Sequence, residues 1–241
     1  MFAYDVQALK ELVGVILQQN ITGDAWVWLS KQGDIENTNA FNVAFVMMPR
    51  KTGKATISVT AEQTADLKTI RPNFDIDDWT VERLSRVFLI VQADPGDRDR
   101  YVKVLENLFL AGEMNELVAL YSALPVLAYP ELWVKRCAEG VRSNIGLVLE
   151  AIMYRNPYPA EQLSQDAWNQ LVMKAIFTEK DLGHITGLQE RNNEELVRIL
   201  LDHARERGAA GRTVVPELWQ LCEPIVGAAA IADLKQQYSL N

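Results

Sequence analysis

The chain has 241 residues, a formal net charge of −8 and an isoelectric point of about 4.9. This acidic balance argues against a nucleic-acid partner, which needs a basic face, and it provides no attraction to anionic lipid. Hydrophobic residues make up 49% of the sequence and charged residues 23%, the usual proportions of a globular protein with a sizeable core.

The cysteines and the N-terminus indicate the compartment. Cys137 and Cys222 lie far apart and in no metal-ligand spacing, which suits a reducing environment without disulfides. Residues 1–16 carry charges within their apolar stretch and lack a small-residue cleavage site, so they predict an amphipathic helix and no signal peptide. No apolar run approaches the ~18 residues that a membrane span needs. We therefore expect a cytoplasmic protein without a transmembrane segment.

Apolar residues recur at helical spacing through the first half of the chain. The expected helices cover residues 5–19, a segment opening at Trp26, and residues 38–48, 61–69, 79–92, 98–111 and 113–124. We expect Pro49 to end the third helix, and residues 50–60, with several β-branched side chains, to form a loop or a short extended piece. Asp77 and Asp78 are expected to cap the helix over 79–92. Gly112 serves as a C-cap, and so short a connection makes the helices on either side antiparallel.

The second half begins with a predicted long helix over residues 131–154. Its buried stripe, spaced by alternating fours and threes, consists of Val134, Ala138, Val141, Ile145, Val148 and Ile152. Asn144 lies at the edge of this stripe. A double-proline turn, Asn156–Pro159, leads into a helix over 164–177, in which Asn169 again lies at the edge of the apolar stripe.

Three shorter helical segments follow. Asn192 and Glu195 form a capping-box-like start for a helix over 193–207, with His203 on its inner face as a core histidine. A short helix opens at Val215-Pro216, and Pro224 separates it from a last helix over 226–238. Helices without strand patterns predict an all-α fold, an array of antiparallel helix hairpins in a curved, helical-repeat-like stack. We expect a single domain over residues 1–241; if it has two layers, the seam lies near 94–97 or 125–130.

No catalytic constellation is evident. His184 and His203 are the only histidines, and no HxxxH, HExxH or CxxC pattern occurs, so we expect neither a metal nor another cofactor. Neither cysteine has an apparent histidine partner, which favours inert packing thiols. Glu139 and Glu150 are separated by roughly 16 Å along one helix, too far to act on a single bond.

The candidate site is a group of polar side chains around the double-proline turn. Its members, which we call the polar cluster, are Glu139, Arg142, Asn144, Asn156, Tyr158, Asn169, Gln170 and Lys174. Two interpretations stay open. The polar cluster either binds a ligand or partner, or it is a structural clasp in which Asn144 and Asn169 bond to each other or to loop carbonyls, because a half-buried amide needs partners. Glu139 and Arg142, three residues apart, are most simply a helix ion pair.

The segment EGVRSNIGLVLEAIMYRNPYPAEQL, continued by WNQLVMKAIF, resembles the signature of the EboA family. The likeness extends through ITGLQERNNEELVRILLDHARERGAAGRTVVPELW, and is specific within residues 131–222. The residues that carry it are Arg142, Asn144, Asn156, Pro157, Tyr158, Pro159, Trp168, Asn169, Gln170, Lys174, Arg191, Asn192 and Arg212. AFVMMPRKTGK and the DWTVERLSRV helix fit more loosely.

The resemblance implies a role in the traffic or processing of a bacterial secondary metabolite or its precursor. It implies as partners a small-molecule metabolite or the proteins encoded in the same gene cluster, and it carries no catalytic residues. Two function classes remain. We favour a non-catalytic binding or scaffold protein that uses the polar cluster. The alternative is a metal-independent enzyme acting there on a polar small-molecule precursor.

Overall fold

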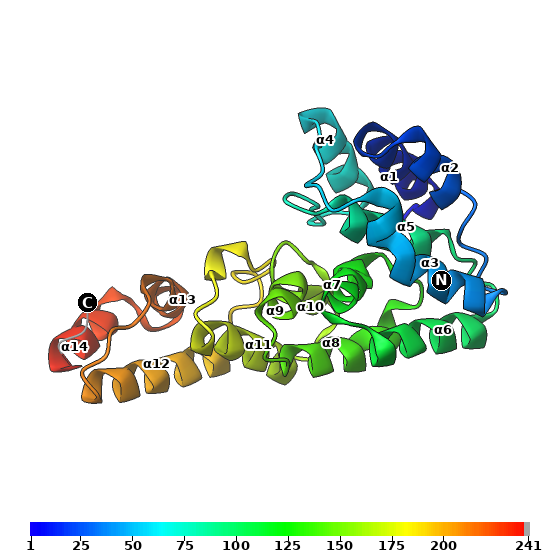
Figure 1. The fold of residues 1–241 in the computed structure, drawn as a ribbon. Helices are drawn as coiled ribbons and strands as arrows, with labels where there is room; N and C mark the ends of the chain where they lie inside the picture. Colours follow the sequence, from blue (N-terminus) through cyan, green and yellow to red (C-terminus); the bar gives the residue numbers. More distant parts are fainter. Residues whose placement is uncertain (239–241) are drawn as a thin grey trace. The chain divides into compact units, whose positions relative to one another are not determined.

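The computed structural model describes residues 1–238, and 69% of the chain is helical (Figure 1). Within this range the only strand-like pairing is an isolated bridge between Thr56 and Thr80, which agrees with the all-α class. The loop or extended piece expected over residues 50–60 begins only at Gly53, because residues 50–52 are helical. The hairpin array and its curved stacking stay predictions. None of the helices within residues 1–238 combines the length and the apolar character that crossing a membrane requires.

The chain forms two compact units, Met1–Gln162 and the part that begins at Leu163. The first unit contains α1 (Val6–Asn20), α2 (Gly23–Leu29), α3 (Thr38–Thr52), α4 (Ala61–Ile70), α5 (Val81–Gln92), α6 (Arg98–Ala111), α7 (Met114–Ala123), α8 (Val134–Val141), α9 (Gly146–Met153) and α10 (Tyr158–Gln162). The second contains α11 (Gln165–Phe177), the short η3 (Leu182–His184), α12 (Glu194–Ala209), α13 (Pro216–Val226) and α14 (Ala228–Tyr238).

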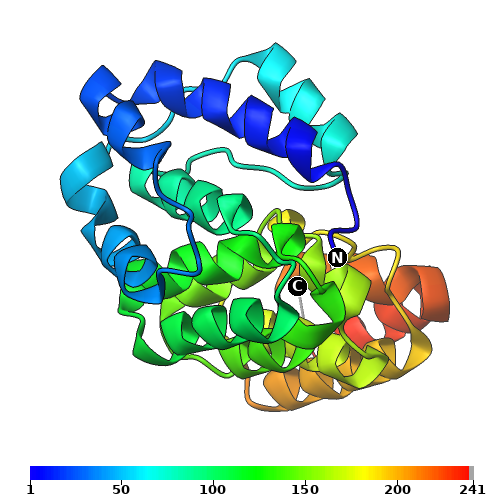
Figure 2. The same ribbon diagram turned by 90° about the vertical axis from the view of Figure 1, so that its right-hand side faces the viewer.

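Helix α5 is the centre of the first unit. Ten of its twelve residues are buried, and it packs against α1, α3 and α7, between which it lies in Figure 2. The helix begins after Thr80, whose Oγ1 accepts a hydrogen bond from the backbone N–H of Arg83. Thr80, and not Asp77 or Asp78, is therefore the N-cap, because Asp78 has a left-handed φ of 63° and lies outside the helix.

Pro49 lies inside α3 and does not end it, so this prediction is wrong. A proline removes one N–H from the helical ladder and leaves the carbonyl four residues earlier without its usual donor. Here that carbonyl belongs to Phe45, and the buried Arg86 of α5 donates its Nε–H to it over 3.0 Å. The guanidinium of Arg86 also pairs with buried Glu82 at 2.8 Å. The helix continues to Gly53, whose φ of 87° suits glycine at a helix end.

The long helix expected over 131–154 is broken. A 3-10 turn, Pro130–Trp133, leads into α8, which ends at Val141, and α9 starts at Gly146. At the break, the backbone N–H groups of Arg142 and Ser143 reach back only three residues, and the Ser143 hydroxyl accepts the N–H of Ile145. This local hydroxyl bond competes with the helical ladder. Ile145 is consequently 39% exposed and no longer part of a buried stripe.

Two boundaries in the second unit differ from expectation. Helix α12 is capped by Asn193 and not by Asn192, since the Asn193 Oδ1 accepts the N–H of Leu196 at 2.9 Å. Pro224 lies within α13, which ends at Gly227 with a φ of 83°. The proline therefore does not separate the last two helices, and the glycine does.

Candidate functional site

The boundary between the two units divides the predicted polar cluster. Glu139, Arg142, Asn144, Asn156 and Tyr158 belong to the first unit, and Asn169, Gln170 and Lys174 to the second. Their side chains differ in exposure: Asn156, Tyr158 and Asn169 are buried, whereas Arg142, Asn144 and Gln170 are exposed.

Asn156 and Tyr158 are tied into the backbone of the first unit. Asn156 Nδ2 donates to the carbonyls of Tyr121 at 3.1 Å and Ala151 at 2.9 Å, and its Oδ1 accepts the N–H of Tyr158 at 3.0 Å. The Tyr158 hydroxyl donates to the carbonyl of Pro130. These bonds are all made within the protein, so Asn156 and Tyr158 fix the turn after α9.

The expected ion pair between Glu139 and Arg142 is absent from the described residues. Glu139 instead pairs with Arg136 at 2.9 Å and with Lys135 at 3.8 Å, both on its own helix. Arg142 follows the last residue of α8. It is exposed, and its side chain has no hydrogen-bond or ion-pair partner within residues 1–238. Asn144 is exposed on the same connection between α8 and α9.

Asn169 forms a reciprocal amide pair with Asn193. Asn169 Nδ2 donates to Asn193 Oδ1 at 3.3 Å, and Asn193 Nδ2 donates to Asn169 Oδ1 at 2.9 Å. Because Asn193 also caps α12, this pair joins α11 to the first turn of α12. Gln170, one residue along α11, is exposed, and Lys174 is half-buried.

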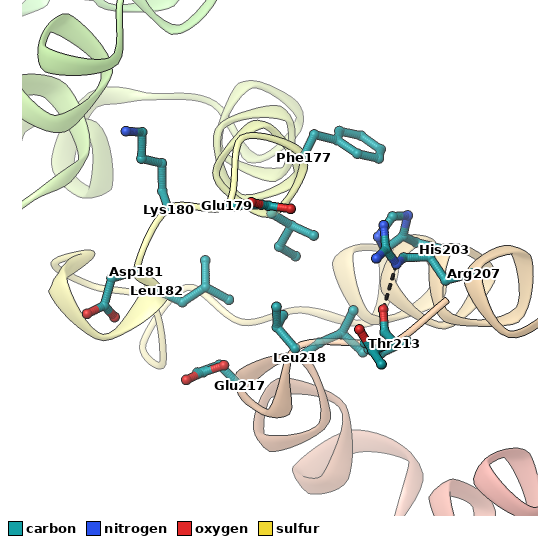
Figure 3. Close-up of a pocket in the computed structure, with 13 residues that line it drawn as sticks. Phe177, Glu179, Lys180, Asp181, Leu182, His203, Arg207, Thr213, Glu217 and Leu218 are labelled. Atoms are coloured by element: carbon teal, nitrogen blue, oxygen red, sulfur yellow. Dashed lines mark hydrogen bonds between the residues drawn. The ribbon is translucent and has the colours of Figure 1, made fainter. Parts of the chain in front are cut away.

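The second unit also contains a pocket of about 440 Å³ that the sequence did not indicate (Figure 3). It lies where the C-terminal end of α11 and the following segment, the last turns of α12 and the first turn of α13 come together. Ile176, Leu182 and Leu218 contribute apolar surface. Phe177 and Val215, which also line it, are 64% and 39% exposed, so apolar groups extend to its rim.

Two charged side chains line different parts of this pocket (Figure 3). Arg207, in the last turn of α12, donates its Nε–H to the carbonyl of Thr213 at 2.7 Å, and within residues 1–238 its terminal nitrogens have no carboxylate partner. Glu217 lies in the first turn of α13 and has no hydrogen-bond or ion-pair partner in the same range. Each charge is at the helix end where the helix dipole stabilises it.

His203 lies beside Arg207 in the pocket and is half-buried, so the prediction of a core histidine is wrong. The ring of Phe177 meets it edge to face, with centroids 5.0 Å apart. Burial, and then the positive charge of Arg207, lowers the pKa of His203, while Glu206 partly opposes the shift. The imidazole is therefore neutral at pH 7. No described residue hydrogen-bonds to its ring.

A second hollow of about 280 Å³ adjoins the pocket in the same unit. The two share Leu182 and Glu217, and the smaller one continues between the segment 182–190 and α13. Glu217 therefore faces both spaces. Sequence reasoning missed this region because its residues come from separate segments; the one signal was Phe177, a large apolar residue at a helix end followed by charged residues.

The thiols and the metal-ligand residues offer no reactive centre in the described chain. Burial raises the pKa of Cys137 and that of Cys222 to about 12, so both are neutral thiols. Within residues 1–238, no three His, Cys, Asp or Glu side chains come together as a metal site.

The sequence of the chain matches the model of a known protein family. The sequence model of EboA, described as metabolite traffic protein EboA, matches residues 9–223. The chain belongs to the EboA family. The match includes the polar cluster and every residue that lines the pocket. No curated protein and no solved structure matches the chain.

Proposed function

We propose that this EboA-family chain is a non-catalytic binding protein in the traffic or processing of a bacterial secondary metabolite or its precursor. The observation that carries the proposal is the pocket of the second unit, whose volume of about 440 Å³ is in the range of small-molecule sites, roughly 300–1,000 Å³. Its mixture of apolar surface with a few charged groups is the usual composition of such sites.

Binding is favoured over catalysis by the state of the pocket's polar groups. A general base is normally oriented by a hydrogen bond from a third group, as in nucleophile–base pairs. His203 has no such partner among the described residues. Burial raises the pKa of both cysteine thiols to about 12, so they stay protonated. The pocket therefore offers recognition groups without an assembled reaction centre.

The exposed members of the polar cluster fit a second role within the same proposal. Arg142 and Asn144 lie on the α8–α9 connection, next to Ile145 and Leu147, which are 39% and 49% exposed. An exposed arginine beside apolar side chains is a composition found in protein interfaces. We propose this connection as a contact for a protein encoded in the same gene cluster.

Co-purification from the native host tests the function. The untagged protein is isolated, its bound small molecules are identified by mass spectrometry, and the isolated compound is incubated with fresh protein. We expect near-stoichiometric recovery of one compound, unchanged after incubation. Conversion of the compound by the protein would favour the metal-independent enzyme, and purification with no bound compound and no partner would contradict both roles.

A further inference from the structure

The pocket of the second unit has opposite charges at separate positions. Arg207 closes α12 and Glu217 opens α13, and the two do not form an ion pair with each other. Figure 3 shows Arg207 beside His203 and Thr213, with Glu217 on the other side of Leu218. The pocket therefore presents a cation and an anion with apolar surface between them.

Arg207 differs from two other arginines of α12, because its terminal guanidinium nitrogens are not paired with a carboxylate of the described residues. Arg198 pairs with Glu195 at 2.7 Å, and Arg205 pairs with Asp202 at 2.8 Å. Arg207 is on the same acidic helix, yet only its Nε is engaged, by a backbone carbonyl. That bond fixes the plane of the guanidinium and leaves the two terminal nitrogens for another acceptor, the fork geometry that suits a carboxylate.

The remaining charges limit what this acceptor can be. Three carboxylates line the pocket, those of Glu179, Asp181 and Glu217, against the two cations of Lys180 and Arg207, since His203 is neutral. A dianionic phosphate would meet more repulsion than a monoanion in such surroundings. A group with a positive charge near Glu217 would offset that carboxylate.

We propose that the pocket binds a zwitterionic small molecule, with a carboxylate on Arg207, an ammonium group near Glu217 and an apolar segment against Leu218 and Phe177. This ligand class rests on the proposed binding function and makes it more specific. His203 contributes a neutral imidazole beside the carboxylate, and the Phe177 ring covers the imidazole from the rim.

Three probes of matched length test the proposal on the full chain: 6-aminohexanoate, hexanoate and hexylamine, titrated and followed by NMR. A charge-assisted hydrogen bond corresponds to at least about tenfold in affinity, so we expect 6-aminohexanoate to bind at least about tenfold more tightly than either single-charge probe. Arg207→Gln should remove its advantage over hexylamine, and Glu217→Gln its advantage over hexanoate.

The controls separate recognition from folding. Arg205→Gln, two residues along the same helix and outside the pocket, should keep the wild-type preference. Arg207→Lys keeps the charge and should retain part of the preference, even if loss of the Thr213 contact lowers the melting temperature. Equal affinities for the three probes, no binding of any probe, or an equal loss in Arg205→Gln overturns the inference. If a native compound still co-purifies in those cases, the proposed function stands and only the ligand class fails.

Discussion

Asn169 and Asn193 hold α11 and α12 together through two hydrogen bonds between their amides, one in each direction, at 3.3 and 2.9 Å. Asn193 is at the same time the N-cap of α12, so its Oδ1 accepts from both the Asn169 amide and the Leu196 backbone. A side chain expected at the edge of one helix is thus fixed by the first turn of another, in the unit that also contains the pocket.

Replacing Asn169 should destabilise the protein. Asn169→Ala removes both hydrogen bonds of the amide pair, while Asn193 keeps its bonds to the Arg191 carbonyl and the Leu196 N–H. At about 0.5–1.5 kcal/mol for each lost bond, we expect a loss of about 1–3 kcal/mol. Gln170→Ala is the matched control, because Gln170 is the next residue of α11 and exposed, and it should change stability by less than about 0.5 kcal/mol. Chemical denaturation measures both. Equal stability of the two variants would show that the amide pair contributes nothing.

Gly140 is required by close packing in the first unit. A Cβ built there would lie 2.5 Å from Ile152 Cδ1 and 2.5 Å from Tyr121 Cε1, too close for any carbon pair. Gly140→Ala should therefore cost about 1–3 kcal/mol through overpacking. Gly23→Ala is the control: nothing lies within 4 Å of its Cβ position, and alanine in a helix should be neutral or gain up to about 1 kcal/mol. Thermal melts of both variants decide the comparison.

Arg142 is predicted to matter for function and not for folding. Its side chain is exposed and has no described ion-pair or hydrogen-bond partner within residues 1–238, so Arg142→Ala should leave stability within about 0.5 kcal/mol of the wild type. We expect the variant to impair metabolite localisation in the native host, which is measured beside its melting curve. A variant with unchanged localisation would remove Arg142 from the site, and one that loses both together would indicate a structural role.

The cysteines should make stability fall in alkaline solution. Burial raises the pKa of both thiols from 9.0 to about 12, so the folded protein keeps protons that the unfolded chain releases. The resulting stabilisation is complete below pH 9 and is lost as the pH rises from 9 towards 12. A thiol-reactive disulfide reagent at pH 8 should label neither cysteine until denaturant is added. Rapid labelling of the folded protein would contradict their burial.

His203 should titrate below its usual pKa, and Arg207→Gln should raise that pKa part of the way back. Burial, the larger cause, persists in the variant, so the pKa stays below 6.5. A lowered histidine pKa stabilises the folded state above pH 6.5, and this contribution is lost as the pH falls through the folded value. NMR titration of the His203 ring measures both pKa values; Arg205→Gln, outside the pocket, serves as the control.

Local chemistry in the sequence was sufficient for the all-α class and for most helix ends. Gly112 ends α6 as predicted, because a cap depends on residues within one turn of chain. Periodicity predicted the helices themselves for the same reason. The resemblance of residues 131–222 to the EboA family also rests on the sequence alone.

Other features depended on groups distant in the chain. Pro49 lies inside α3, and Arg86, 37 residues later, donates a hydrogen bond to the Phe45 carbonyl that the proline leaves without a donor. The residues next to a proline in the sequence do not reveal so distant a donor. The apolar spacing over residues 131–154 continues across the α8–α9 break. It does not predict the break, because the hydrogen bond from the Ile145 N–H to the Ser143 hydroxyl leaves no mark on apolar spacing. The pocket unites the ends of α11 and α12 with the start of α13, and no spacing rule links them. Packing of these segments, and not any motif, brings Arg207 and Glu217 to one cavity, since a cavity forms only where separate elements leave space between their side chains.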